Sequence, residues 1–138
     1  MTGLKDLDVA VSATEAWLGD LMQRLGWQDR ERAYLVLLAA LHALRDCLPF
    51  EEAIYVGACF PPLLRGLYYE GCHPKRRTIR SRKVFLERIH DGVHRDPGID
   101  PEQVAHAIFA LLAARLPASE VEEAKAVTPE PLRALWPS

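Results

Sequence analysis

The sequence predicts an all-α protein built from two similar halves. Apolar residues recur at the three- and four-residue spacing of helices, and no stretch alternates with the period of two that strands show. The chain also matches itself at an offset of 68 residues, so that residues 17–68 align with 85–136 without a gap. Twelve of these 52 pairs are identical, whereas composition alone would give roughly four. We therefore expect two pseudo-repeats of about four helices each, packed into a single helical domain over residues 1–138.

The composition is that of an ordinary globular protein. Of the 138 residues, 49% are hydrophobic and 26% are charged, and the net charge is -2. A nearly neutral chain does not favour a surface devoted wholly to nucleic acid. No apolar run has the length of a signal peptide or a membrane span, so we expect a cytoplasmic protein that does not enter a membrane. Cys47, Cys59 and Cys72 lack the spacing of a metal site or disulfide framework, which predicts reduced thiols.

An apolar stripe indicates the first helix of each half. The stripe consists of Trp17, Leu18, Leu21 and Leu25 in the first half and of Phe85, Leu86, Ile89 and Val93 in the second. These residues share one face of a helix, which must pack inward. Ser12 and Glu15 have the spacing of a capping box, which predicts that the helix of the first half begins there.

The second helix of each half has clear start and stop signals. Asp29 and Asp100 are expected N-caps, and Pro101 is suited to the first helical position. A Leu-Pro pair at residues 48–49 and again at 116–117 predicts the end of both helices.

The two second helices differ in their surroundings. The helix from about Arg30 to Asp46 is apolar almost all round, because Leu35 and Leu38 stand where the other half has Gln103 and His106. A helix that is apolar on every side is normally buried on every side. We therefore expect it at the centre of the protein or at a dimer contact.

Two shorter helices are predicted to follow in each half. The third helices are expected within residues 50–59 and 118–127, and the fourth within 61–71 and 129–138. Gly71 suits the left-handed cap at the end of a helix. Trp136 takes the place of Tyr68 in the repeat, so we expect it to pack near Phe85 and Phe109 in an ordered carboxyl terminus.

Several short sequence motifs are typical of a known family. They are "LHALRD" at residues 41–46, "LPFEEA" at 48–53 and "LLRGLYYEG" at 63–71, with "FLERI" and "LRALWP" in the second half. In these motifs the chain resembles the bacterial family catalogued as domain of unknown function 2267, and the resemblance covers nearly all of its length after residue 15. The resemblance implies a compact all-helical protein with internal pseudo-symmetry, and it implies no activity, ligand or catalytic residue.

Two polar residues are retained at the same spacing in both halves. Glu52 and Arg65 recur as Glu120 and Arg133. We predict that each third helix pairs its glutamate with the arginine of the helix that follows. Exposed pairs of this kind stabilise a protein by only about 0 to 1 kcal/mol. The arginines have an alternative role, which is to bind neighbouring carbonyl groups.

The segment that joins the halves, residues 71–83, is the strongest charge anomaly in the chain. We call it the basic connector, because residues 75–83 include six cations and no acidic residue: Lys75, Arg76, Arg77, Arg80, Arg82 and Lys83. Most charge runs are solvated linkers. However, Arg82 and Lys83 precede a helix start that would favour an anion, so an anion site that these side chains share with the helix amino terminus is the alternative.

No residue pattern indicates an enzyme or a cofactor. His42 is expected to bond a carbonyl or Asp46 rather than act as a base, since no nucleophile accompanies it. His90 and His94 with Glu87 could share a face as metal ligands, but the repeat places His94 at or beyond a helix end. We therefore expect no bound metal. The sequence favours a non-enzymatic regulatory or interaction module that binds a protein or itself, with anion or nucleic-acid binding through residues 75–83 as the alternative.

Overall fold

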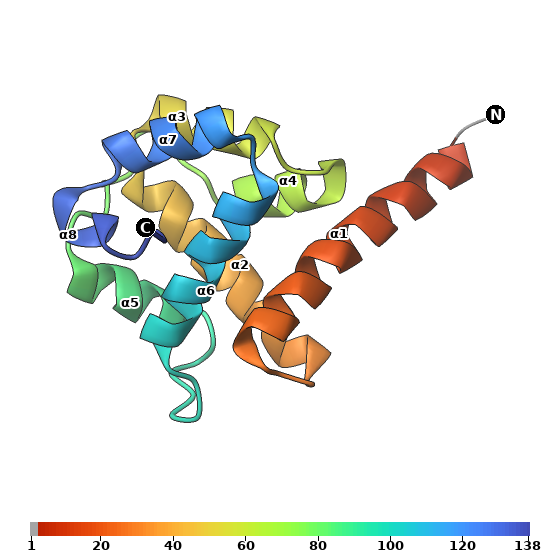
Figure 1. Cartoon of the computed structure of the whole chain (residues 1–138), viewed down its shortest axis with the longest axis horizontal. Coiled ribbons are helices and arrows are strands. Elements are labelled where there is room, and N and C mark those ends of the chain that lie inside the picture. The colour runs from red at the N-terminus through yellow and green to blue at the C-terminus, as the bar shows by residue number, and fades with distance from the viewer. Residues whose placement is uncertain (1–2) are drawn as a thin grey trace.

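The computed structural model describes residues 3–138, which form helices joined by short loops (Figure 1). The helices are α1 (Gly3–Leu25), α2 (Arg30–Cys47), α3 (Phe50–Ala58), α4 (Pro62–Tyr69), α5 (Arg82–Asp91), α6 (Pro101–Arg115), α7 (Ala118–Val127) and α8 (Glu130–Arg133). Residues 3–138 contain no strand. The predicted all-α fold class is therefore confirmed, while the internal duplication stays a prediction.

The helices of the two halves are packed across one another. α1 contacts α6 and α2 contacts α5, so the first helix of each half lies against the second helix of the other. α3 contacts α7, and these two helices lie side by side at the top of Figure 1. One continuous cluster of buried residues runs through both halves. Neither half therefore has a hydrophobic core that is independent of the other.

α2 lies at the centre of this arrangement. It contacts α1, α3, α4, α5 and α6, and most of its side chains from Val36 to Cys47 are buried. The prediction of burial on every side is wrong for its first turns, where Tyr34 and Leu35 are 36% and 42% exposed. These turns lie at the edge of the bundle beside the end of α1, where fewer helices surround them (Figure 1).

The predicted N-caps and the predicted left-handed cap are confirmed. The Asp29 carboxylate accepts a hydrogen bond from the Arg32 amide at 3.2 Å, and the Asp100 carboxylate accepts one from the Glu102 amide at 3.0 Å. Gly71, just after α4, has φ of +78°, which glycine adopts without steric cost.

The predicted helix start at Ser12 is wrong. α1 begins at Gly3, so Ser12 lies inside the helix. The Glu15 side chain does not close a capping box but accepts a hydrogen bond from Arg30 Nη2 at 3.1 Å. The preceding residues are good enough helix formers to extend the helix through Ser12 to Gly3.

The carboxyl terminus is ordered by Trp136, as predicted. Its side chain is only 5% exposed and contacts the Phe109 ring edge-on, with ring centroids 4.6 Å apart. Phe109 in turn lies 5.8 Å from the ring of Phe85. The indole N–H donates to the hydroxyl of the buried Thr128 at 3.0 Å. This contact fixes the end of the chain against the turn between α7 and α8.

Replacing Trp136 should destabilise the whole protein. We expect Trp136→Ala to lower the free energy of unfolding by about 3 to 5 kcal/mol, because the variant leaves a cavity beside Phe109. Trp136→Phe should lose much less, since it keeps most of the packing and gives up only the bond to Thr128. Urea unfolding followed by circular dichroism measures both values. An alanine variant with the midpoint of the parent would show that the terminus is dispensable.

Candidate functional site

The basic connector is held against the body by one of its own cations. Arg76 Nη2 donates to the carbonyls of Arg45 and Leu48 at 2.9 and 2.8 Å. Arg76 Nε lies 2.9 Å from a carboxylate oxygen of Asp46, and the arginine side chain is only 11% exposed. The expectation that Arg76 belongs to an open anion site is therefore wrong, because its charge is used at the carboxyl end of α2.

Asp46 is the centre of this contact. Its carboxylate also accepts hydrogen bonds from Arg45 Nε at 2.8 Å and from Arg88 Nη1 at 2.8 Å. Burial acts to raise the pKa of Asp46, but the hydrogen bonds and charges of Arg45, Arg88 and Arg76 outweigh it and lower that pKa below its ordinary value. The carboxylate thus stays ionised and joins α2, α5 and the connector.

The amino terminus of α5 is not an open anion site either. The Ser81 hydroxyl accepts a hydrogen bond from the Val84 amide at 3.2 Å and caps the helix. Arg82 forms an ion pair with Glu102 at the start of α6. The prediction that Arg82 faces an anion together with the helix terminus is wrong, because a carboxylate of the protein itself already neutralises it.

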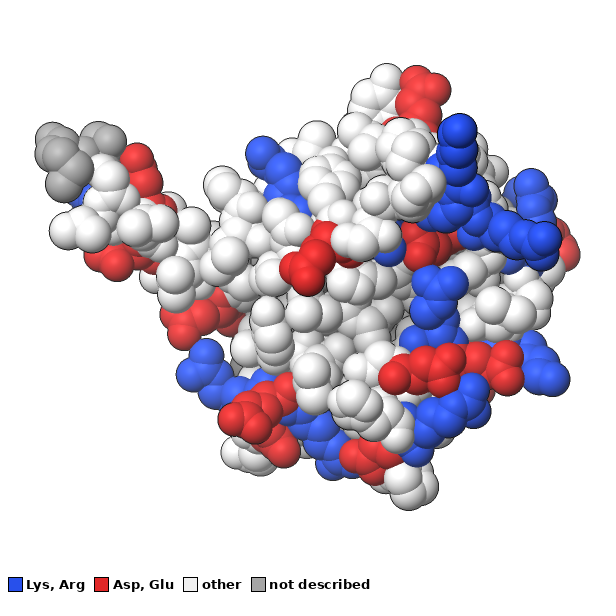
Figure 2. Space-filling view, turned by 180° about the vertical axis from the view of Figure 1, so that it is seen from behind, with Lys and Arg blue, Asp and Glu red and all other residues white. Residues whose placement is uncertain are grey.

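Four of the six predicted cations remain, namely Lys75, Arg77, Arg80 and Lys83. Their side chains lie in exposed residues and have no ion-pair or hydrogen-bond partner within residues 3–138. On the face shown in Figure 2, most Lys and Arg side chains gather on the half of the molecule away from α1, with acidic groups among them. Among these four cations, Arg80 lines a cleft of about 340 Å³.

The predicted glutamate–arginine pairs are wrong in both halves. Arg65 Nη2 donates to the carbonyl of Phe60 at 3.0 Å, and Arg133 Nε donates to the carbonyl of Thr128 at 2.9 Å. Within residues 3–138 neither arginine forms an ion pair with the glutamate of its own half. Each arginine lies just after the end of a third helix, where the last carbonyls need donors and favour a cation.

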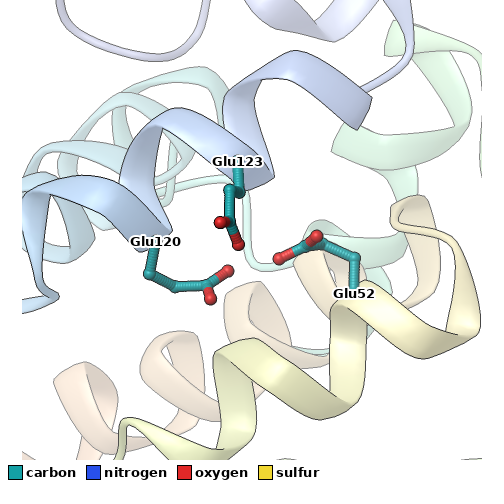
Figure 3. Close-up of side chains that lie close together, drawn as sticks. All are labelled: Glu52, Glu120 and Glu123. Carbon is teal, nitrogen blue, oxygen red and sulfur yellow. The ribbon is translucent and has the colours of Figure 1, made fainter.

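The retained glutamates instead meet each other. Figure 3 shows Glu52 of α3 facing Glu120 and Glu123 of α7, and one carboxylate oxygen from each lies within 4.8 Å of the others. Oε2 of Glu52 and Oε2 of Glu120 are buried without a hydrogen-bond donor within residues 3–138. Sequence reasoning missed this cluster. The available signal was that identical acidic residues at equivalent positions meet wherever equivalent helices pack together.

Like charges in this cluster change its protonation. Burial, followed by the neighbouring carboxyl groups of Glu52 and Glu123, raises the pKa of Glu120 to about 8. A protonated Glu120 can donate its hydroxyl to the Glu52 carboxylate, so that one proton serves the pair. Three carboxylates could also hold a hard cation such as Mg²⁺ or Ca²⁺. The expectation of no bound metal stays a prediction.

This cluster should make stability depend on pH. The pKa of Glu120 is raised from 4.5 to about 8 on folding, so the folded state holds an extra proton between these values and its stability falls as pH rises. We expect the melting temperature to decline from pH 6 to pH 9. Glu120→Gln should remove most of the decline, because its amide donates to Glu52 at every pH.

Glu122 provides the matched control for this measurement. It is an exposed residue of α7 outside the cluster, so Glu122→Gln should keep the decline of the parent. Melting curves with and without a chelator should coincide. A decline that is unchanged in Glu120→Gln would show that the proton is not shared there, and a chelator-sensitive melt would show that a cation holds the cluster.

The histidines are placed by main-chain contacts. His42 Nε2 donates to the carbonyl of Leu67 at 2.7 Å, and a carbonyl was one of the two partners expected for it. His90 Nε2 donates to the carbonyl of Asp96 at 2.8 Å. α5 ends at Asp91, and His94 lies beyond it with φ of 57°. The two histidines therefore do not form a ligand pair on one helix, which confirms the interpretation from the repeat.

Over residues 3–138 the fold is that of a small all-helical protein. The model of the family described as "Uncharacterized conserved protein (DUF2267)" matches residues 14–135, and the chain belongs to this family. The resemblance seen in the sequence is thereby confirmed. The comparison with curated proteins gives no match. No helix within residues 3–138 combines the length and apolar character that crossing a bilayer requires.

Proposed function

We propose that the protein is a non-enzymatic interaction module that pairs with a second copy of itself through residues 3–13 of α1. We call this part the α1 extension. The observation that carries the proposal is its place in the structure: the α1 extension projects away from the other helices (Figure 1). Its large apolar side chains are exposed to solvent. A cytoplasmic location is part of the same proposal.

Three of the four large apolar side chains exposed on the α1 extension form a stripe, and the fourth, Val9, lies on another face. Leu4, Leu7 and Val11 are 68%, 62% and 47% exposed, and their spacing of three and four residues places them on one face of the helix. The same spacing leads on to Leu18 and Leu21, which are buried in the core. The α1 extension thus continues, without cover, a face that the rest of α1 packs against the protein.

The α1 extension is helical as a continuation of the packed part of α1, and a covering partner would stabilise it further, because helices owe most of their stability in proteins to the packing of an apolar face. At the offset of 68 residues, the segment that corresponds to residues 3–13 is 71–81, which lies on the body with Ile79 only 4% exposed. Leu4, Leu7 and Val11 have no such cover, so this face of the helix would gain most from an external partner.

A second copy supplies a partner of matching length and spacing. Two extensions that run antiparallel about a two-fold axis would overlap over about 16 Å. In one such register Leu7 of each helix faces Val11 of the other, and a two-fold axis makes the contact self-complementary. Lys5 and Asp8 give the extension charges of both signs. Few apolar side chains take part, which favours a weak dimer over an obligate one.

Sedimentation velocity over about 10 to 500 μM protein tests this pairing. The parent should shift from monomer to dimer as its concentration rises. The double variant Leu7→Glu, Val11→Glu should remain monomeric and keep the melting temperature of the parent, because neither residue belongs to the core. Ser12→Glu adds one charge to another face of the same segment and should dimerise like the parent.

Two results would contradict the pairing. One is a parent that stays monomeric at the highest concentration. The other is dimerisation that the Leu7→Glu, Val11→Glu variant retains, since another surface would then hold the two copies together.

The alternative function, anion or nucleic-acid binding through residues 75–83, has narrower support. Arg76 and Arg82 are engaged within the protein, and Ser81 caps the helix that was expected to help bind the anion. Long-range attraction of a polyanion would therefore depend on four exposed cations in a chain of net charge -2. What favours anion binding is local, because Arg80 lies in a cleft.

A further inference from the structure

We propose that the cleft between the basic connector and the turn from α7 to α8 binds a small molecule that carries one carboxylate and an apolar group. This inference deepens the anion-binding alternative and does not depend on pairing through the α1 extension. The cleft has a volume of about 340 Å³. That size is near the lower end of small-molecule pockets in proteins.

The connector forms one wall of the cleft and is fixed in place. Ile79 is buried, and its amide donates to the carbonyl of Asp46 at 2.8 Å. Successive side chains of an extended segment point to opposite sides, so Thr78 and Arg80 face away from the core, and both line the cleft. Arg76 holds the segment a few residues earlier. The Arg80 guanidinium is thus presented from an anchored backbone rather than from a free linker.

The turn from α7 to α8 forms the opposite wall and is equally constrained. Thr128 is fully buried, and its hydroxyl accepts a hydrogen bond from Trp136 Nε1 and donates to the carbonyl of Ala124 at 2.7 Å. Arg133 donates through Nε to the carbonyl of Thr128. That bond leaves the two terminal nitrogens of Arg133 available to a ligand. Both walls are therefore formed before any ligand arrives, which lowers the entropic cost of binding.

The charges around the cleft select a singly charged anion. Arg80 and Arg133 contribute two cations and Glu130 one anion, and neither Arg80 nor Glu130 has a side-chain partner within residues 3–138. Guanidinium groups bind carboxylates through paired hydrogen bonds. A dianionic phosphate would be attracted more strongly by the arginines, but it costs more to remove from water and would leave one negative charge in the cleft uncompensated. The net charge of the lining thus favours a monocarboxylate.

Apolar groups complete the lining and argue for an apolar part of the ligand. Pro49 lies at the end of α2, and Val127 and Pro129 lie on the turn opposite it. Val127 is 40% exposed although it is a large apolar residue. An aromatic or branched aliphatic group would cover these side chains while its carboxylate reaches Arg80. A polymer of phosphates would leave them in water.

The test is a titration of the ¹⁵N-labelled protein with benzoate, followed by two-dimensional NMR. Benzoate should shift amides in residues 47–49, 78–80 and 127–133. Inorganic phosphate and benzyl alcohol are the comparison probes, because each has only one of the two required features. Both should bind at least about tenfold more weakly than benzoate, since each omits either the charged hydrogen bonds or the apolar contact.

Variants of the connector and the turn make the assignment specific. Arg80→Gln should weaken benzoate binding about tenfold. Arg77→Gln is the matched control, because Arg77 is an exposed connector cation that does not line the cleft, and it should bind benzoate like the parent. Glu130→Gln should strengthen binding by removing the one negative charge of the lining. The amide spectra of all three variants report whether the fold is kept.

Three outcomes would overturn the proposal. The first is that benzoate shifts no amides of the cleft. Phosphate or benzyl alcohol could bind as tightly as benzoate, which would refute the proposed ligand class. Equal losses in Arg80→Gln and Arg77→Gln would show a diffuse charge effect rather than a site.

Discussion

The ionised carboxylate of Asp46 is the polar contact that ties the connector and α5 to the central helix. It lies at the end of the central helix, and Arg45, Arg76 and Arg88 approach it from α2, the connector and α5. The single negative charge of Asp46 does not neutralise the positive charges of all three arginines. Arg45 and Arg76 also donate to carbonyls at the ends of α4 and α2, where the helix dipole favours cations. A buried carboxylate, helix ends and guanidinium groups are therefore mutually satisfied.

The same contact removes one cation of the basic connector from the surface and fixes the segment around it. Arg76 forms an ion pair with Asp46, and the buried Ile79 fixes the backbone beside it. A segment that reads as a flexible charged linker is thereby turned into a rigid wall that presents Arg80. Stability and the proposed anion site are linked here, because the interaction that removes Arg76 from the surface also holds the segment that places Arg80 at a cleft.

The α3–α7 contact follows a different principle from the Asp46 cluster. At Asp46 opposite charges meet, and the carboxylate stays ionised. Between α3 and α7, Glu52 and Glu120 meet with no arginine or lysine of residues 3–138 paired to them, and burial raises the pKa of Glu120 until it holds a proton. Arg65 and Arg133 do not reduce the repulsion between these glutamates, because each donates instead to a carbonyl just after α3 or α7.

Local signals in the sequence determined much of the fold. The helical periodicity, the Asp caps, the Leu-Pro stops and the glycine after α4 each depend on a few neighbouring residues, so the elements could be predicted in order. The start of α1 could not, because a capping box at Ser12 competes with helix propensity on both sides of it. Burial of Leu35 was also mispredicted, since an apolar helix face is covered only where other elements reach it.

Tertiary structure alone decided which polar groups meet. In the sequence Glu52 and Arg65 recur as Glu120 and Arg133. This recurrence could not show that the glutamates face each other while the arginines bind carbonyls. It counted six connector cations but could not separate Arg76, which is turned inward, from Arg80, which lines a cleft. The physical reason is the range of the interactions. Helix formation depends on residues a few positions apart in the sequence. Ion pairs, clefts and shared protons instead join groups that are brought close only by the packing of the helices.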